Sequence, residues 1–208
     1  MAKKIFINIL IVLLIIICMH YLRIYNIIKN AYATSEIFNN ANNILLTREV
    51  YNEDESGENI LNATIEYRIA NNWALVIIKD SNGKIANVFK VNLETYTVEE
   101  FAYIEGTFIK QSESNVPTPQ EYLDNTLCYL TEGRSSDKFF VDSLFRIISM
   151  DKDNYIIKVR AQDGTEDIVY LSRQDFTATK IKEANKTTTT YKYELGVVTD
   201  DMLDIHNL

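Results

Sequence analysis

The stretch Leu61-Asn62-Ala63-Thr64-Ile65-Glu66-Tyr67-Arg68-Ile69 alternates apolar and polar side chains at every position. Successive side chains of a strand point to opposite faces of a sheet, so this period of two predicts a strand with one buried and one wet face. Such alternation is typical of antiparallel sheets, which can leave one face in water. The stretch therefore predicts that an antiparallel sheet is the main element of the fold.

Further strands are predicted on the C-terminal side of this stretch. The next four cover 73–79, 85–91, 96–101 and 103–110. The dipeptide Asn82-Gly83 is a strong hairpin signal, because both central positions of a tight hairpin turn favour positive φ. After an interruption the same pattern returns, and strands are predicted over 155–161, 167–171, 176–182 and 187–197.

Helices are predicted on both sides of the first group of strands. Apolar residues at steps of three and four predict a helix over 24–46. Thr118 can cap a helix over 118–130 with Pro119 at its first position, and a further short helix is predicted over 137–145. The expected fold class is α+β. An N-terminal membrane helix precedes a curved antiparallel sheet, an incomplete barrel, packed on two or three helices.

The N-terminal segment has the length and composition of a membrane span. Residues 5–22 form an 18-residue apolar run in which Asn8 is the first polar residue, and about 17–25 residues are needed to cross a bilayer. Lys3 and Lys4 precede the run, which favours a cytoplasmic N-terminus and a domain outside the cytoplasm. The predicted anchor residues are Ile5, Leu10, Leu14, Ile17 and Tyr21.

The sequence allows three processing fates for this segment. Lipidation at Cys18 is disfavoured because the large Ile17 precedes it, where a small residue is needed. Ala31-Tyr32-Ala33 has the form of a signal cleavage site but lies far from the apolar run. We therefore expect an uncleaved, single-pass anchor in the cell membrane. The expected domains are 1–33, the anchor and the start of the connecting helix, and 34–208, an extracytoplasmic half-barrel.

The charge distribution excludes one class of partner. The formal net charge of the 208 residues is −8, and Lys3, Lys4, Arg23 and Lys29 all precede the first acidic residue, Glu36. The remaining chain carries 17 of the 21 basic side chains and all 29 acidic ones, a balance of −12. Such a domain repels nucleic acid, and its net charge should also hold it off an anionic membrane surface.

No catalytic residue, metal ligand or cofactor is predicted, and we expect the protein not to be an enzyme. The two histidines, His20 and His206, lie in the anchor and near the C-terminus, where neither is placed to act as a general base. The segment starting at Asp151 begins like a calcium loop but has Ile156 and Gln162 where such a loop needs glycine and glutamate.

The aromatic residues allow two interpretations, a filled core or an apolar ligand groove on the concave face of the sheet. Thirteen Tyr and nine Phe are present. The predicted groove residues are Tyr67, Trp73, Phe89, Tyr155, Tyr191 and Tyr193.

The C-terminal strands resemble a known family. The segments 153–159, Asp163-Gly164-Thr165, 169–173 and 191–201 follow each other as in the LolA-like lipoprotein-carrier superfamily of bacteria, in its Gram-positive branch. The resemblance implies an incomplete antiparallel barrel with helices in its concave face, where the best-known members bind acyl chains. The hairpin over 73–101 is also similar to propeptide domains of the peptidase-inhibitor type.

The expected function is therefore a membrane-anchored extracytoplasmic domain that binds lipid or another apolar ligand in a half-barrel groove. The alternative is a protein-interaction module of a cell-envelope or signalling complex. The expected partners are the membrane and either a lipid ligand or an envelope protein. A tethered domain cannot carry a ligand between membranes, so it is expected to act where it is anchored.

Overall fold

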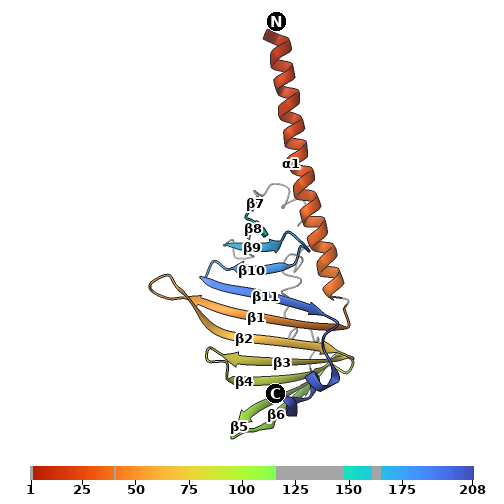
Figure 1. Ribbon diagram of the computed structural model, residues 1–208, viewed down its shortest axis with the longest axis vertical. Coiled ribbons are helices and arrows are strands. Elements are labelled where there is room, and N and C mark those ends of the chain that lie inside the picture. The colour runs from red at the N-terminus through yellow and green to blue at the C-terminus, as the bar shows by residue number, and fades with distance from the viewer. Residues whose placement is uncertain (1, 40, 116–147, 161–164) are drawn as a thin grey trace.

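The computed structural model describes residues 2–39, 41–115, 148–160 and 165–208. Within these ranges one long α-helix, α1 (Ala2–Asn39), leads into a large antiparallel sheet (Figure 1). The helix has 38 residues, which corresponds to about 57 Å at 1.5 Å per residue. It is long and apolar enough over Lys4–Ala31 to cross a membrane by length and composition, and an 18-residue window within it has a mean hydropathy of 2.8.

Within the described ranges eleven strands form the sheet, and each neighbouring pair runs antiparallel. In chain order they are β1 (Asn43–Glu53), β2 (Asn59–Ala70), β3 (Trp73–Asp80), β4 (Ile85–Asn92), β5 (Thr97–Ile104), β6 (Thr107–Asn115), β7 (Ile148–Met150), β8 (Asn154–Arg160), β9 (Glu166–Ser172), β10 (Ala178–Lys182) and β11 (Thr187–Leu195). Two short 3₁₀ helices, η3 (Asp200–Leu203) and η4 (Ile205–Asn207), end the chain.

The sheet consists of two meanders joined at one central pair of strands. The spatial order is β6-β5-β4-β3-β2-β1-β11-β10-β9-β8-β7. Strands β1 and β11, from opposite ends of the domain sequence, pair along their length from Ile44 opposite Leu195 to Asn52 opposite Thr187. Among the described strands β6 and β7 are the two edges, so the described sheet is open. The predicted N-terminal apolar helix and large open antiparallel sheet are therefore confirmed.

The strand register divides the side chains between two faces. Leu46 lies opposite both Tyr67 and Tyr193, and Tyr67 lies opposite Val76. The same face continues across the sheet through Phe89, Val50, Thr189, Ile181, Val169, Leu171, Ile157 and Tyr155. We call it the helix-side face, because α1 packs on it, and the opposite face the tail-side face.

The second half of α1 belongs to the core of the sheet domain. Its inward residues recur at helical spacing, and Ile24, Ile27, Ile28 and Ala31 are each less than 5% exposed. They form one cluster with Ile157 of β8, Val169 and Leu171 of β9, and Ile181 of β10. Burial of each isoleucine contributes about 2 kcal/mol, so this contact is a large share of the stability of an ordinary domain.

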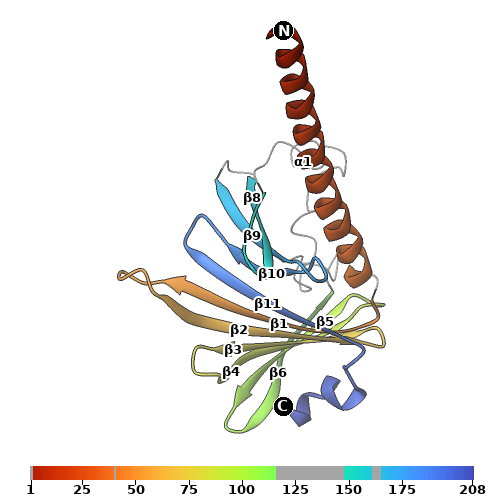
Figure 2. The ribbon, with the colours of Figure 1, turned by 45° about the horizontal axis from the view of Figure 1, so that its top comes forward.

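The C-terminal segment packs on the tail-side face instead. Val198, Leu203 and Ile205 form a cluster with apolar residues that include Leu75, Ile77 and Val88. The side-chain amide of Asn43 donates to the carbonyl oxygen of Val198 at 2.7 Å and accepts from its N–H at 2.9 Å. The chain end is thereby tied to the first strand, and Figure 2 shows it far from the N-terminus of α1.

The helices differ from the prediction in two respects. The helix predicted over 24–46 ends at Asn39, and Asn43 already begins β1, where Ile44 and Leu46 are buried in the sheet. The helices predicted over 118–130 and 137–145 lie outside the described residues. In the described part of the chain α1 is the one α-helix, so the expectation of two or three packed helices is not borne out there.

Two turns also differ from the prediction. The hairpin at Asn82-Gly83 has a positive φ at Gly83 alone (79°), and the Asp80 carboxylate accepts from the N–H groups of Asn82 and Lys84 at 2.9 Å each. The strand predicted from residue 103 is interrupted by positive φ at Glu105 (50°) and Gly106 (85°), so β6 begins only at Thr107.

Removal of the second half of α1 should destabilise the sheet domain. We expect the fragment 34–208 to unfold with a free energy lower by roughly 5 kcal/mol or more than the fragment 20–208, because only the longer one retains the buried isoleucines of α1. Urea denaturation followed by circular dichroism measures the difference. Equal midpoints for the two fragments would show that the helix packing contributes nothing.

Candidate functional site

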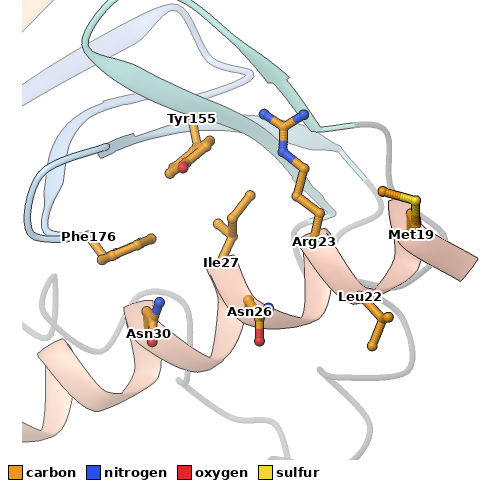
Figure 3. A pocket seen from close by; sticks show the side chains of 8 residues that line it. All are labelled: Met19, Leu22, Arg23, Asn26, Ile27, Asn30, Tyr155 and Phe176. Carbon is orange, nitrogen blue, oxygen red and sulfur yellow. The ribbon is translucent and has the colours of Figure 1, made fainter.

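A pocket lies between α1 and the β7–β10 part of the sheet. Its volume is about 400 Å³, within the range of small-molecule sites. Six of its lining residues come from α1, one from β8 and one from the turn between β9 and β10 (Figure 3). They are Met19, Leu22, Arg23, Asn26, Ile27, Asn30, Tyr155 and Phe176.

Two stacked rings form the sheet-side wall of the pocket. Tyr155 and Phe176 lie with ring centroids 5.9 Å apart and an angle of 15° between their planes. The guanidinium of Arg173 lies 5.7 Å from the centroid of the Tyr155 ring and donates to the carbonyl oxygens of Asp151 and Lys152 at 3.2 Å each. Arg173 therefore holds the turn before β8 against the ring that lines the pocket.

Two turns position these rings. The Asp151 carboxylate accepts from the backbone N–H groups of Asn154 (2.6 Å) and Asp153 (2.9 Å), which hold the pKa of this carboxyl below its ordinary value. Phe176 has a positive φ of 63°, and its turn contacts the helix where the Thr34 hydroxyl donates to the carbonyl oxygen of Asp175 at 2.8 Å. A hydrogen bond from a side chain of α1 to the backbone of the turn thus joins this pocket wall to the helix.

Arg23 is the charged residue of the pocket. Its Nη2 donates to the thioether sulfur of Met150 at 2.8 Å, and a thioether is a weak acceptor. Within the described ranges no carboxylate lies at ion-pair distance from this guanidinium. The amides of Asn26 and Asn30 also line the pocket, so a positive charge and hydrogen-bonding groups share one side of it.

The pocket adjoins the exposed apolar surface of α1. Met19 and Leu22 line it and are 65% and 62% exposed. They continue the run in which the predicted anchor residues Ile5, Leu10, Leu14 and Ile17 are about half exposed and Tyr21 is partly buried. No spacer separates this run from the sheet, because Ile24 is already buried in the core. The net charge of the domain predicts that it stays at a distance from an anionic membrane surface. The direct connection between the apolar run and the sheet provides no linker that would create this distance.

The predicted groove residues are divided between clusters and faces. Phe89, Tyr191 and Tyr193 pack around the buried Tyr67 on the helix-side face. Tyr191 also contacts the cluster around α1, which includes Tyr155, so these five aromatic residues share one continuous face. Trp73 lies on the tail-side face, with the Lys90 ammonium 5.1 Å from its ring. It is three positions from Val76, which pairs with Tyr67, and an odd step reverses the face.

Sequence reasoning did not assign Arg23, Asn26, Asn30 or Phe176 to the site. The polar residues among them recur at steps of three and four beside the buried stripe of the helix, and this spacing is the signal that could have indicated them. Within the described ranges no group of three or more His, Cys, Asp or Glu side chains is placed to hold a metal ion.

One buried polar group on the helix-side face has a predictable energetic effect. Thr189 is fully buried, and among the described residues its hydroxyl oxygen finds no hydrogen-bond partner. Replacement Thr189→Val keeps the shape and removes the desolvation cost, so it should raise the free energy of unfolding by about 1 kcal/mol. The control Thr190→Val loses a hydrogen bond to Glu49 and should lower it. Urea denaturation compares both, and a destabilised Thr189→Val variant would mean that the hydroxyl has a partner.

Comparisons with known proteins give weak structural similarity alone. No protein-family model and no curated protein matches the chain. Among solved structures, PNGF-II is 12% identical with a TM-score of 0.37, over 79% of this chain and 30% of that one. An outer membrane lipoprotein-sorting protein domain from Vibrio parahaemolyticus is 7% identical with a TM-score of 0.29, over 86% and 95%. The second resembles the family expected from the C-terminal strands, and at these TM-scores neither similarity supports an argument about function.

Proposed function

We propose that the protein is a single-pass membrane protein whose extracytoplasmic sheet domain binds a lipid or another apolar ligand, without catalysing a reaction. The ligand would enter the pocket between α1 and β8–β10 and lie along the helix-side face. The observation that carries the proposal is the continuity of the pocket with the exposed apolar surface of α1 at Met19 and Leu22.

The anchor part of the proposal is supported by the exposure of the apolar run. Residues 5–19 are exposed on all sides of the helix, and a helix that is apolar all round is stable only where another apolar phase covers it. About 27 Å of helix between residues 5 and 22, at 1.5 Å per residue, approaches the thickness of a hydrocarbon core. Lys3 and Lys4 on one side and Arg23 on the other would bound the span.

The ligand part is supported by the chemistry of the pocket. Its walls combine apolar and aromatic side chains, Ile27, Tyr155 and Phe176, with a few polar groups from α1. Such a composition is typical of sites for largely apolar ligands whose polar end is oriented by specific contacts. The aromatic cluster around Tyr67 extends the same face toward the centre of the sheet.

A variant that fills the pocket from the helix tests the proposal. Asn26 is exposed and lines the pocket, so Asn26→Trp should occupy it without removing a core residue. Ala33→Trp is the matched control, because Ala33 is exposed on α1 and does not line the pocket. Native mass spectrometry of the full chain released from lipid nanodiscs should show bound lipid in the wild type and in the control, reduced several-fold in Asn26→Trp. A wild type that emerges free of lipid would refute the proposal.

Protein binding is a second candidate function, favoured by one observation. Strand β6 is an edge of the described sheet and is exposed along nearly its whole length, and an open edge can accept a strand from a partner. Its charges, Lys110 paired with Glu99 and Glu113, are of the kind that protect edges from unspecific pairing. Crosslinking in intact membranes should join a partner protein through Lys110; crosslinks confined to other surfaces would argue against this role.

A further inference from the structure

Arg23 lies at the boundary between the apolar run of α1 and the folded domain. It is the first charged residue after Lys4, and the helix positions between them include no other charge. Figure 3 shows its side chain extending from α1 to the side where Tyr155 lies, with Met19 and Leu22 on the neighbouring turn. The Arg23 guanidinium therefore lies where the pocket adjoins the exposed apolar side chains of Met19 and Leu22, which we call its apolar rim.

The guanidinium of Arg23 is available to an anion. Its contact within the described residues is the thioether of Met150, which leaves its other N–H groups without a strong acceptor there. Arg173, whose guanidinium lies near the Tyr155 ring of the pocket wall, is used differently, because it donates to two backbone carbonyls. A planar guanidinium binds phosphate oxygens in pairs, so Arg23 is suited to a phosphate group.

The surroundings of Arg23 indicate where such a phosphate comes from. Leu22 and Met19 expose most of their surface and continue into the apolar run that we propose to cross the bilayer. An acyl chain could follow this surface while its head group reached Arg23, because phosphates lie just outside the hydrocarbon core. A soluble phosphate compound would make no use of the apolar rim. Charge and apolar surface together fit a phospholipid of the surrounding leaflet.

We infer that the pocket binds an anionic phospholipid of this leaflet, with its phosphate on Arg23 and its glycerol region beside Asn26 and Asn30. The inference rests on the proposed function, since it names the class of lipid that the same pocket takes. An anionic lipid is favoured over a zwitterionic one because Arg23 lines the pocket and none of the eight lining residues carries a carboxylate to receive the positive group of a zwitterionic head.

The test uses the full chain in nanodiscs of phosphatidylcholine containing a minor share of phosphatidylglycerol. Native mass spectrometry then measures which lipid stays bound after release. The wild type should retain phosphatidylglycerol about fivefold above its share, as expected for one cation near a membrane surface. Arg23→Gln should lose this enrichment, and Arg23→Lys should restore part of it. Lys29→Gln is the matched control, because Lys29 is an exposed cation of the same helix that does not line the pocket.

Each other result has a defined meaning. If the wild type binds both lipids in proportion to their abundance, the proposed function stands and the inference about charge is wrong. If Lys29→Gln loses the enrichment as Arg23→Gln does, the effect is a diffuse attraction and the inference is also wrong. Release of the bound lipid by excess soluble glycerol phosphate would overturn the assignment to a membrane lipid. No bound lipid at all would refute the proposed function itself.

Discussion

The packing of Ile24, Ile27, Ile28 and Ala31 on β8–β10 is the contact on which the rest of the structure depends. Because of this contact, α1 has two parts. Residues 5–19 are apolar and exposed, and the four residues of the contact belong to the core of the sheet domain. A flexible linker would uncouple the anchor from the sheet. Here the helical hydrogen bonds continue through residue 23, so the orientation of the sheet relative to α1 is determined by side-chain packing.

Because α1 packs directly on the sheet, the charges at that end of the sheet lie close to the proposed membrane span. The net charge of the domain is strongly negative, which by itself favours distance from an anionic surface. The end of the sheet that contacts α1, however, carries charges of both signs: Arg23, Lys152 and Arg173 lie in the same region as Asp151 and Asp153. Electrostatic interactions are screened over about 10 Å in ordinary salt, so these nearby charges matter more at that end than the net charge of the whole domain does.

The parts of the fold that follow from local pattern could be predicted, and the parts that depend on tertiary contacts could not. Alternation in 61–69 and in 187–197 gave strands close to β2 and β11, because a half-buried strand must alternate. The helix predicted over 24–46 was too long, because Ala41 and Leu45 continue the helical spacing of apolar residues. Pairing with β2 and β11 makes 43–53 a strand instead. Trp73 lies on the tail-side face, away from the other five predicted groove residues, because the turn at Asn71 and Asn72, both with positive φ, determines the register.

The pocket was beyond prediction for a related reason. Its two walls, Asn26 of α1 and Phe176 after β9, are brought together by a sheet whose strand order joins the two ends of the domain sequence. The pairing of β1 with β11 makes β7 and β6 the opposite edges, separated by up to roughly 50 Å along the sheet at about 4.8 Å per strand. Because α1 packs on the β7 side, a bilayer around its apolar run would adjoin β7 and leave β6 remote. Lipid binding at the pocket and protein binding at β6 would then be spatially separate and could occur in one molecule.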